Sequence, residues 1–180
     1  MLILASGSPR RAKILREHGV AFTVVKTDAE ETGIDDDPVA TVTGNALRKL
    51  AVAPGEEALA ADTIVWLNGR IYGKPRDLDE AKAFLRELSG KTHSVWTGVA
   101  YRKAGKTQTA AAESRVTFKV LSGRDIDEYV RLVNPLDRAG AYDIDDFGPL
   151  VVERYEGEYE NIMGLPLAPL RDFGIVHREI

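Results

Sequence analysis

The feature that most constrains the fold is an apolar stretch with a single acid inside it. Residues 58–67 read ALAADTIVWL, and Asp62 is the only charged residue among them. Such a run predicts a buried β-strand. Because a lone buried carboxylate is strongly unfavourable, it needs a cation, a metal ion or hydrogen-bond donors beside it. Asp62 is therefore either an acid used in metal-assisted chemistry on an anion, or a core or strand-end Asp satisfied locally.

The chain turns back soon after this strand. Asn68 and Gly69 form a typical hairpin dipeptide, and Lys74 follows in the sequence GKP. We therefore expect Lys74 to return beside the strand and to face Asp62. A carboxylate opposite a lysine suits metal-assisted chemistry on an anionic substrate.

A second anion-binding pattern lies at the N-terminus. Residues 2–5 predict a short buried strand, and the loop SGSP leads into a helix that begins near Arg10, with Ser8 as a suitable N-cap. Backbone N–H groups at such a junction bind phosphate or carboxylate, and Arg10 and Arg11 add charged donors. The alternative is a solvated first turn. We favour anion binding because arginines at a helix N-terminus oppose the helix dipole.

Acidic residues gather in the segment that follows a strand expected over residues 22–26. They are Asp28, Glu30, Glu31, Asp35, Asp36 and Asp37. Most should be solvated, and spacing does not say which one would ligate a metal. An amphipathic helix is then predicted from its apolar stripe of Val39, Val42, Thr43, Ala46, Leu47 and Leu50. Lys49 lies at the edge of that stripe and points either outward or into a cleft.

The second half of the chain predicts scaffold elements and two loops. We expect a helix over 77–90, a hairpin of strands 92–102 and 107–121, a helix after Ser122, a loop over 139–148, a strand over 150–154, an ordered loop over 157–166 and a final helix over 167–173. His93 should be structural rather than a metal ligand. The loop over 139–148 is either a ligand-contacting wall or a plain turn. This order of elements predicts a mixed α/β sheet with helices packed on it, in a single domain over 1–180.

Composition excludes several classes of protein. The net charge of −4 gives no overall basic field for a nucleic acid polymer. The absence of cysteine excludes disulfides, zinc–thiolate sites and thiol nucleophiles. No stretch approaches the ~20 apolar residues of a membrane helix, and no signal peptide precedes the first strand. We therefore expect a cytoplasmic protein without a membrane partner.

Eight segments also occur in an order and spacing found in one known family. They are SGSPRR, the last Glu of DAEE, the Lys of NALRKLA, AADTIV, GKPRD, SGKTHSVWTG, PLDRAGAY and ENIMGLPL. Together they resemble the Maf family of nucleoside triphosphate pyrophosphatases, once described as septum-formation inhibitors. The resemblance covers essentially the whole chain.

The resemblance implies a fold and an activity. It implies a bent mixed sheet flanked by helices, with two lobes around a central cleft as in the inosine-triphosphatase-like enzymes. It also implies hydrolysis of a nucleoside triphosphate to the monophosphate and pyrophosphate by attack of water at the α-phosphorus, with Mg²⁺, Mn²⁺ or Co²⁺, in a homodimer. By resemblance, Asp62 and Glu31 are the catalytic and metal-binding acids, Arg10, Lys49 and Lys74 bind the triphosphate, and Ser8 lies in the phosphate-contacting loop.

Base preference is also implied by the resemblance. The branch that acts on dTTP and UTP has Arg, Thr and Gln at three recognition positions, which are Arg11, Thr63 and Asp145 here. The branch that prefers 7-methyl-GTP has Trp in place of the Arg and Glu at the third position, so Asp145 leans toward that pattern. A pairing of Arg11 with Asp145 is a further alternative. We predict dTTP and UTP as substrates; the alternatives are 7-methyl-GTP, or a nucleotide-binding regulator of septum formation with little turnover.

Overall fold

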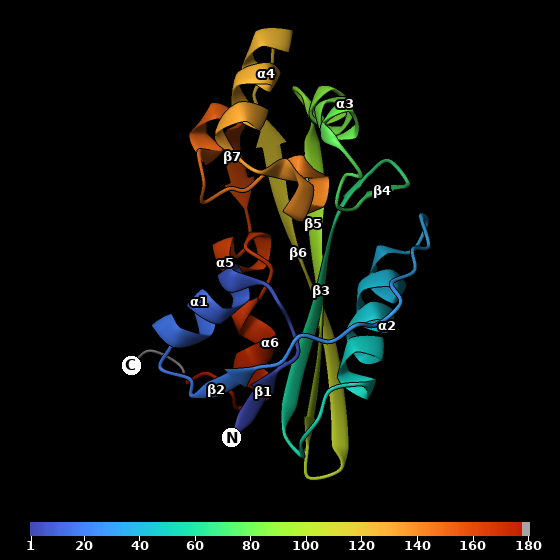
Figure 1. Ribbon diagram of the computed structural model, residues 1–180, viewed down its shortest axis with the longest axis vertical. Coiled ribbons are helices and arrows are strands. Elements are labelled where there is room, and N and C mark those ends of the chain that lie inside the picture. The colour runs from blue at the N-terminus through green and yellow to red at the C-terminus, as the bar shows by residue number, and fades with distance from the viewer. Residues whose placement is uncertain (178–180) are drawn as a thin grey trace.

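The fold is organised around one seven-stranded mixed sheet, shown in Figure 1 by a computed structural model that describes residues 1–177. The strands are β1 (Leu2–Leu4), β2 (Phe22–Val24), β3 (Ala58–Leu67), β4 (Arg70–Tyr72), β5 (Thr92–Lys103), β6 (Lys106–Phe118) and β7 (Val152–Glu156). Their order is β2-β1-β3-β5-β6-β7, and β4 pairs with the end of β3. β1 runs parallel to β2 and β3, whereas the other pairs are antiparallel. The predicted mixed α/β class is confirmed.

Six α-helices cover this sheet. They are α1 (Pro9–Glu17), α2 (Pro38–Ala51), α3 (Leu78–Leu88), α4 (Gly123–Leu132), α5 (Tyr159–Ile162) and α6 (Leu167–Asp172) in the described part of the chain. The predicted N-cap Ser8 accepts a hydrogen bond at the start of α1, and Ser122 forms a capping box at the start of α4. Figure 1 shows α2 on the opposite side of the long strands from α1 and α6. Both faces of the sheet are therefore covered at the end of the molecule that contains β1.

Alternation along β3 divides its side chains between these two faces. Leu59 and Ala61 join a core with α1 and α6, whereas Ala58 and Ala60 join a smaller core with α2. This explains why β3 reads as a continuous apolar run. A strand that is buried on both sides has no solvent-facing position for a polar residue.

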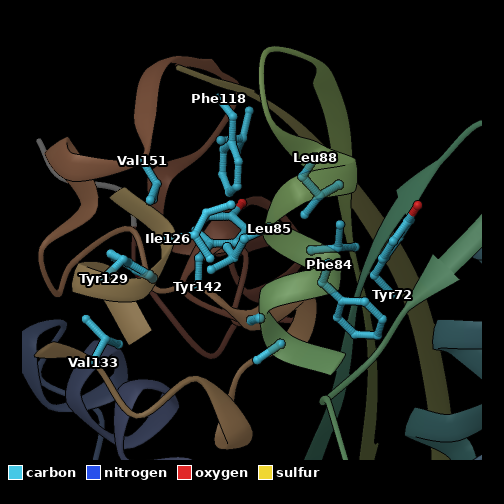
Figure 2. Close-up of a cluster of buried hydrophobic side chains, with 14 of the residues drawn as sticks. Tyr72, Phe84, Leu85, Leu88, Phe118, Ile126, Tyr129, Val133, Tyr142 and Val151 are labelled. Atoms are coloured by element: carbon cyan, nitrogen blue, oxygen red, sulfur yellow. The ribbon is translucent and has the colours of Figure 1, made fainter. Parts of the chain in front are cut away.

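A separate core lies at the other end of the long strands. Figure 2 shows side chains of α3, among them Leu85 and Leu88, facing Ile126 of α4, with Phe118 and Tyr142 beside them. The strands β3, β5 and β6 are long enough to pass from one core to the other. The molecule thus has two packed halves that share a sheet.

Several predicted boundaries were wrong. β6 ends at Phe118, β7 spans Val152–Glu156 after a 3₁₀ turn, and the expected loop over 157–166 contains α5. On α2, Val39 and Leu47 are both exposed, and the buried positions are Thr41, Val42, Asn45, Ala46 and Leu50. The buried face of α2 is rotated toward Asn45, because Asn45 makes a polar contact with Asp62 of β3. Within residues 1–177, no helix has the length and apolar character needed to cross a membrane.

Candidate functional site

A cavity of about 560 Å³ lies between the two halves. The loop after β1, the middle of β3 and the segments around Lys74 and Asp143 all line it. Its cationic lining residues are Arg10, Arg11, Lys26, Lys49 and Lys74, and its acidic ones are Glu31, Asp62, Asp137 and Asp143. The volume is typical of small-molecule sites, which range over ~300–1,000 Å³. The mixture of charges suits a ligand that is strongly anionic at one end.

Asp62 is held in this cavity by two side chains of α2. Lys49 Nζ donates to Oδ1 at 3.0 Å, and Asn45 Nδ2 donates to Oδ2 at 2.9 Å. The Asp62 side chain is only 7% exposed, so these donors compensate its burial. The partners of the acid in the apolar strand therefore come from a helix far from it in the sequence.

Lys49 also brings the second predicted acid to the same place. Its Nζ lies 2.9 Å from Glu31 Oε1, so one ammonium group joins Glu31 to Asp62. Partial burial raises the pKa of Glu31, but the hydrogen bond and charge of Lys49, with the charges of Lys74 and Arg11, leave that pKa below its usual value. Of the two alternatives for Lys49, the inward orientation is confirmed.

The two acids fit the requirement of a divalent ion. Each has an oxygen within 3.0 Å of the same Lys49 nitrogen, so both carboxylates reach a common point. No group of three or more His, Cys, Asp or Glu residues suited to a metal occurs among residues 1–177. Mg²⁺ commonly uses one or two protein carboxylates and takes its other ligands from substrate phosphates and water. Metal binding by Asp62 and Glu31 stays a prediction that this donor pair supports.

Arg10 is positioned by Asp143, an acid that we did not predict as a site residue. Arg10 Nη1 and Arg138 Nε lie 3.4 and 2.9 Å from the same Oδ2 of Asp143. The Asp143 side chain is buried, and its backbone is fixed by hydrogen bonds with the Tyr129 hydroxyl. Burial lowers the pKa of Arg10, whereas the neighbouring charge of Asp143 raises it, and the net change is downward. Asp143 thus holds two cations at one wall of the cavity.

Arg11 is tied to three separate segments. Its Nε donates to the carbonyl of Gly164 at 2.7 Å, Nη1 to Ser6 Oγ at 3.0 Å, and Nη2 to Thr63 Oγ1 at 3.1 Å. Burial lowers the pKa of Arg11, and Asp62 partly counters this effect. Arg11 and Thr63, to which the family resemblance assigns base recognition, therefore contact each other in the cavity wall.

Asp145 does not join them. Its carboxylate accepts hydrogen bonds from Lys13 Nζ at 3.2 Å and from the Tyr159 hydroxyl at 2.8 Å. The pairing of Arg11 with Asp145 is wrong, because Arg11 is directed to Thr63 and Gly164 instead. Asp145 is not one of the residues that line the cavity within the described part of the chain. A role for Asp145 in base preference stays a prediction.

Lys74 lines the cavity but does not face Asp62 in the expected way. Its Nζ lies 3.4 Å from Asp137 Oδ1, and both side chains are mostly exposed. Such an exposed ion pair holds its lysine weakly. Lys74 is therefore available to a ligand from the half of the molecule opposite Lys49.

Three residues that hold the side chains of the site were not predicted from the sequence. Asn45 had one signal, since it is a polar residue on the buried side of an amphipathic helix. Asp143 lies in the loop over 139–148. This loop lines the cavity through Tyr142 and Asp143, and contact of the loop with a ligand stays a prediction. Nothing in the local pattern distinguished Arg138 from a solvated arginine.

Comparisons with known proteins agree with this geometry. A family model described as Maf-like protein matches residues 1–173. A dTTP/UTP pyrophosphatase from Bacillus cytotoxicus is 46% identical over 173 residues, which cover 93% of this chain and 91% of the relative. One from Bacillus cereus strain B4264 is 45% identical over 174 residues, covering 94% and 91%. The solved structure of the Staphylococcus aureus Ham1 protein matches with a TM-score of 0.56 over 96% of both chains, and at 17% identity it supports the fold alone.

Proposed function

This chain belongs to the family of Maf-like proteins, and we propose that it is a nucleoside triphosphate pyrophosphatase acting on dTTP and UTP. The observation that carries the proposal is the buried Asp62 carboxylate, which Lys49 and Asn45 hold at the wall of a cation-lined cavity. The curated relatives with about 45% identity are named for the same two nucleotides. The bound substrate would be a nucleoside triphosphate rather than a nucleic acid polymer.

The reaction divides naturally among the residues of the cavity. A water oxygen attacks the α-phosphorus, the bond to the bridging oxygen breaks, and pyrophosphate leaves. A carboxylate offers about four lone-pair sites, and Asn45 and Lys49 occupy two at Asp62. The remaining sites can orient the attacking water and accept its proton.

Cations from both halves match the triphosphate. Arg10 and Lys49 come from one half of the cavity and Lys74 from the other, so a bound triphosphate would contact both. The loop of Ser8 adds backbone N–H groups at the start of α1. A divalent ion held by Glu31 and Asp62 would supply further neutralisation of charge on the phosphate oxygens.

A nucleotide panel tests the proposal. We expect pyrophosphate release from dTTP and UTP with Mg²⁺, Mn²⁺ or Co²⁺, and its loss on addition of EDTA. The variant Asp62→Asn should lower kcat by about a thousandfold, since it removes the proton acceptor. Glu128→Gln, an exposed change on α4, is the matched control. Thermal unfolding of each variant shows whether it is folded.

The same panel separates the alternatives. Faster turnover of 7-methyl-GTP than of dTTP and UTP would replace the proposed substrates. Binding of nucleotides without hydrolysis would favour a regulatory role. The variant Asp145→Gln tests the predicted part of Asp145: changed relative rates for UTP and 7-methyl-GTP would support it, and unchanged rates would remove it.

A homodimer and a cytoplasmic location complete the proposal. Light scattering on the purified protein tests the first, and cell fractionation tests the second. Neither is needed for the chemistry described above.

A further inference from the structure

A line of hydroxyl groups runs from the cavity into the core. Arg11 Nη2 contacts Thr63 Oγ1 at 3.1 Å, and Thr63 Oγ1 lies 2.9 Å from Thr97 Oγ1. Thr97 Oγ1 then lies 3.2 Å from the carbonyl oxygen of Asn161. Thr63 on β3 and Thr97 on β5 are directly paired in the sheet, and Thr97 is fully buried. Only the cavity end of this line can meet a ligand.

The direction of every hydrogen bond in the line follows from its two ends. The carbonyl of Asn161 can only accept, so Thr97 must donate its single hydroxyl hydrogen to it. Thr97 must then accept from Thr63. A guanidinium group can only donate, so the Thr63 oxygen also accepts from Arg11.

Thr63 can only accept a hydrogen bond from a ligand in the cavity. Its hydrogen is committed to Thr97, and Arg11 occupies one of its two lone pairs. The remaining lone pair can accept a hydrogen bond, and no hydrogen is left to donate. Arg11 donates three of its five N–H groups to protein atoms. Its remaining two N–H groups can only donate to a ligand, because a guanidinium group has no acceptor.

Pyrimidine bases differ at the atom that such a pair would read. Uracil and thymine carry a hydrogen on N3 between two carbonyl groups, whereas the N3 of cytosine is a bare acceptor. The Thr63 acceptor beside the Arg11 donors is complementary to the N3–H and a neighbouring carbonyl group of uracil or thymine. A cytosine N3 facing the Thr63 lone pair would leave two acceptors in contact, which is unfavourable in a partly desolvated site.

We propose that Thr97 is a specificity-determining residue that acts through Thr63: by taking the hydroxyl hydrogen of Thr63, it makes Thr63 accept from N3–H of uracil or thymine and reject cytosine. The inference rests on the proposed function and on the assignment of base recognition to Arg11 and Thr63 that the family resemblance implies. Thr97 itself touches no substrate and is a positioning residue.

The test uses the near-isosteric change Thr97→Val. It frees the Thr63 hydrogen, which can then turn to the cavity and donate to N3 of cytosine. We expect the ratio of kcat/KM for UTP over CTP to narrow by about tenfold, mainly through a lower KM for CTP. The ratio should narrow rather than vanish, because the 4-amino group of cytosine still differs from the uracil carbonyl.

Two further variants separate this role from a structural one. Thr97→Ser keeps the hydroxyl and should keep the wild-type ratio. Ser114→Ala is the matched control, because Ser114 Oγ is a buried hydroxyl that contacts Asn161 Nδ2 at 3.0 Å without contacting Thr63. A folded Thr97→Val protein with the wild-type ratio would overturn the inference. So would an equal change in all three variants.

A measurement on the wild-type protein keeps the test independent of the stability of the variants. Calorimetry with UMP and N3-methyl-UMP should show about tenfold or weaker binding of the methylated nucleotide, because it lacks the hydrogen that Thr63 accepts. Equal binding of the two would overturn the inference. If the protein binds UMP more tightly than N3-methyl-UMP but hydrolyses no nucleoside triphosphate, the proposed function fails. The inference is then decided by the binding of UMP and CMP to Thr97→Val, where an unchanged ratio of the two affinities would overturn it.

Discussion

Asp143 illustrates how a single carboxylate can set the charge distribution of a binding site. Its Oδ2 faces the guanidinium groups of Arg10 and Arg138, and its Oδ1 accepts from the backbone N–H of Asp145. The Asp143 side chain is 5% exposed, so water does not screen these contacts fully. The acid therefore keeps two arginines from repelling each other and holds Arg10 at the cavity.

The change Asp143→Asn should affect both stability and substrate binding. It removes the negative charge between two partly buried cations, and we expect a loss of about 2 kcal/mol in the free energy of unfolding. The KM for UTP should rise about tenfold, because Arg10, which we propose to bind the phosphates, would contact them already in the ground state. Urea unfolding and steady-state kinetics measure the two effects. Asp127→Asn, which removes only an exposed pair with Lys82, should change neither.

Helix α2 is the element that supplies the hydrogen-bond donors of Asp62. It crosses β5 at Gly98, where a Cβ atom would stand 2.4 Å from the backbone carbon and oxygen of Val42. Gly98 is also the sheet partner of Asp62. The close approach of α2 at this point brings Asn45 and Lys49 within hydrogen-bond distance of the Asp62 carboxylate.

The change Gly98→Ala should therefore displace α2. A methyl group has no space against helix backbone, so we expect destabilisation by about 3 kcal/mol, together with a lower kcat as Lys49 and Asn45 move away from Asp62. Gly123→Ala is the control, because a Cβ atom there meets no neighbour within 4 Å. Thermal unfolding and kinetics measure the two effects. Equal stability and equal kcat of Gly98→Ala and Gly123→Ala would contradict the close packing of α2 at Gly98.

At the scale of the whole molecule, two cores share three long strands and enclose the cavity between them. The core near α3 and α4 contains His93, whose ring packs edge-on against Phe118 and Tyr142. Its Nε2 lies 2.9 Å from the Tyr142 hydroxyl. Burial lowers the pKa of His93 from 6.5 to about 3, so the ring is neutral in the folded protein. The prediction that His93 is structural agrees with this position, and Tyr142 beside it lines the cavity.

This buried ring should make the protein sensitive to acid. Above pH ~6.5 His93 is neutral in both the folded and unfolded chains and has no effect on pH dependence. Between that pH and about 3 the unfolded chain takes up a proton that the folded chain excludes, so stability falls as the pH falls.

The slope from this group approaches about 1.4 kcal/mol per pH unit. His93→Gln should reduce the decline, although it lowers stability at neutral pH. Urea unfolding from pH 7 to pH 4 measures both effects. His177→Gln, at an exposed position, should leave the wild-type slope; an unchanged slope in His93→Gln would contradict the assignment.

Local patterns in the sequence were sufficient for most of the elements and for half of the site. The cap at Ser8, the strand around Asp62 and the hairpin of β5 and β6 depend on neighbouring residues, so they could be predicted. The resemblance added Glu31 and Lys49, and the structure brings both to Asp62. The position of Asn45 on its helix gave only a weak signal, and the role of Asp143 gave none, because its partner Arg10 is distant in the sequence.

The sequence by itself determined that an acid would be buried in a central strand and that a helix capped by Ser8 would carry Arg10 and Arg11 after the first strand. Periodicity, capping and apolar runs express short-range preferences of the chain, and these preferences survive folding. Only the tertiary structure decided which donors reach Asp62, that Lys74 pairs with Asp137, and that Arg11 turns to Thr63 rather than Asp145. Those choices depend on how α2 and the loop over 139–148 pack against the sheet, because hydrogen bonds and ion pairs form only between groups that packing has already brought within about 3 Å.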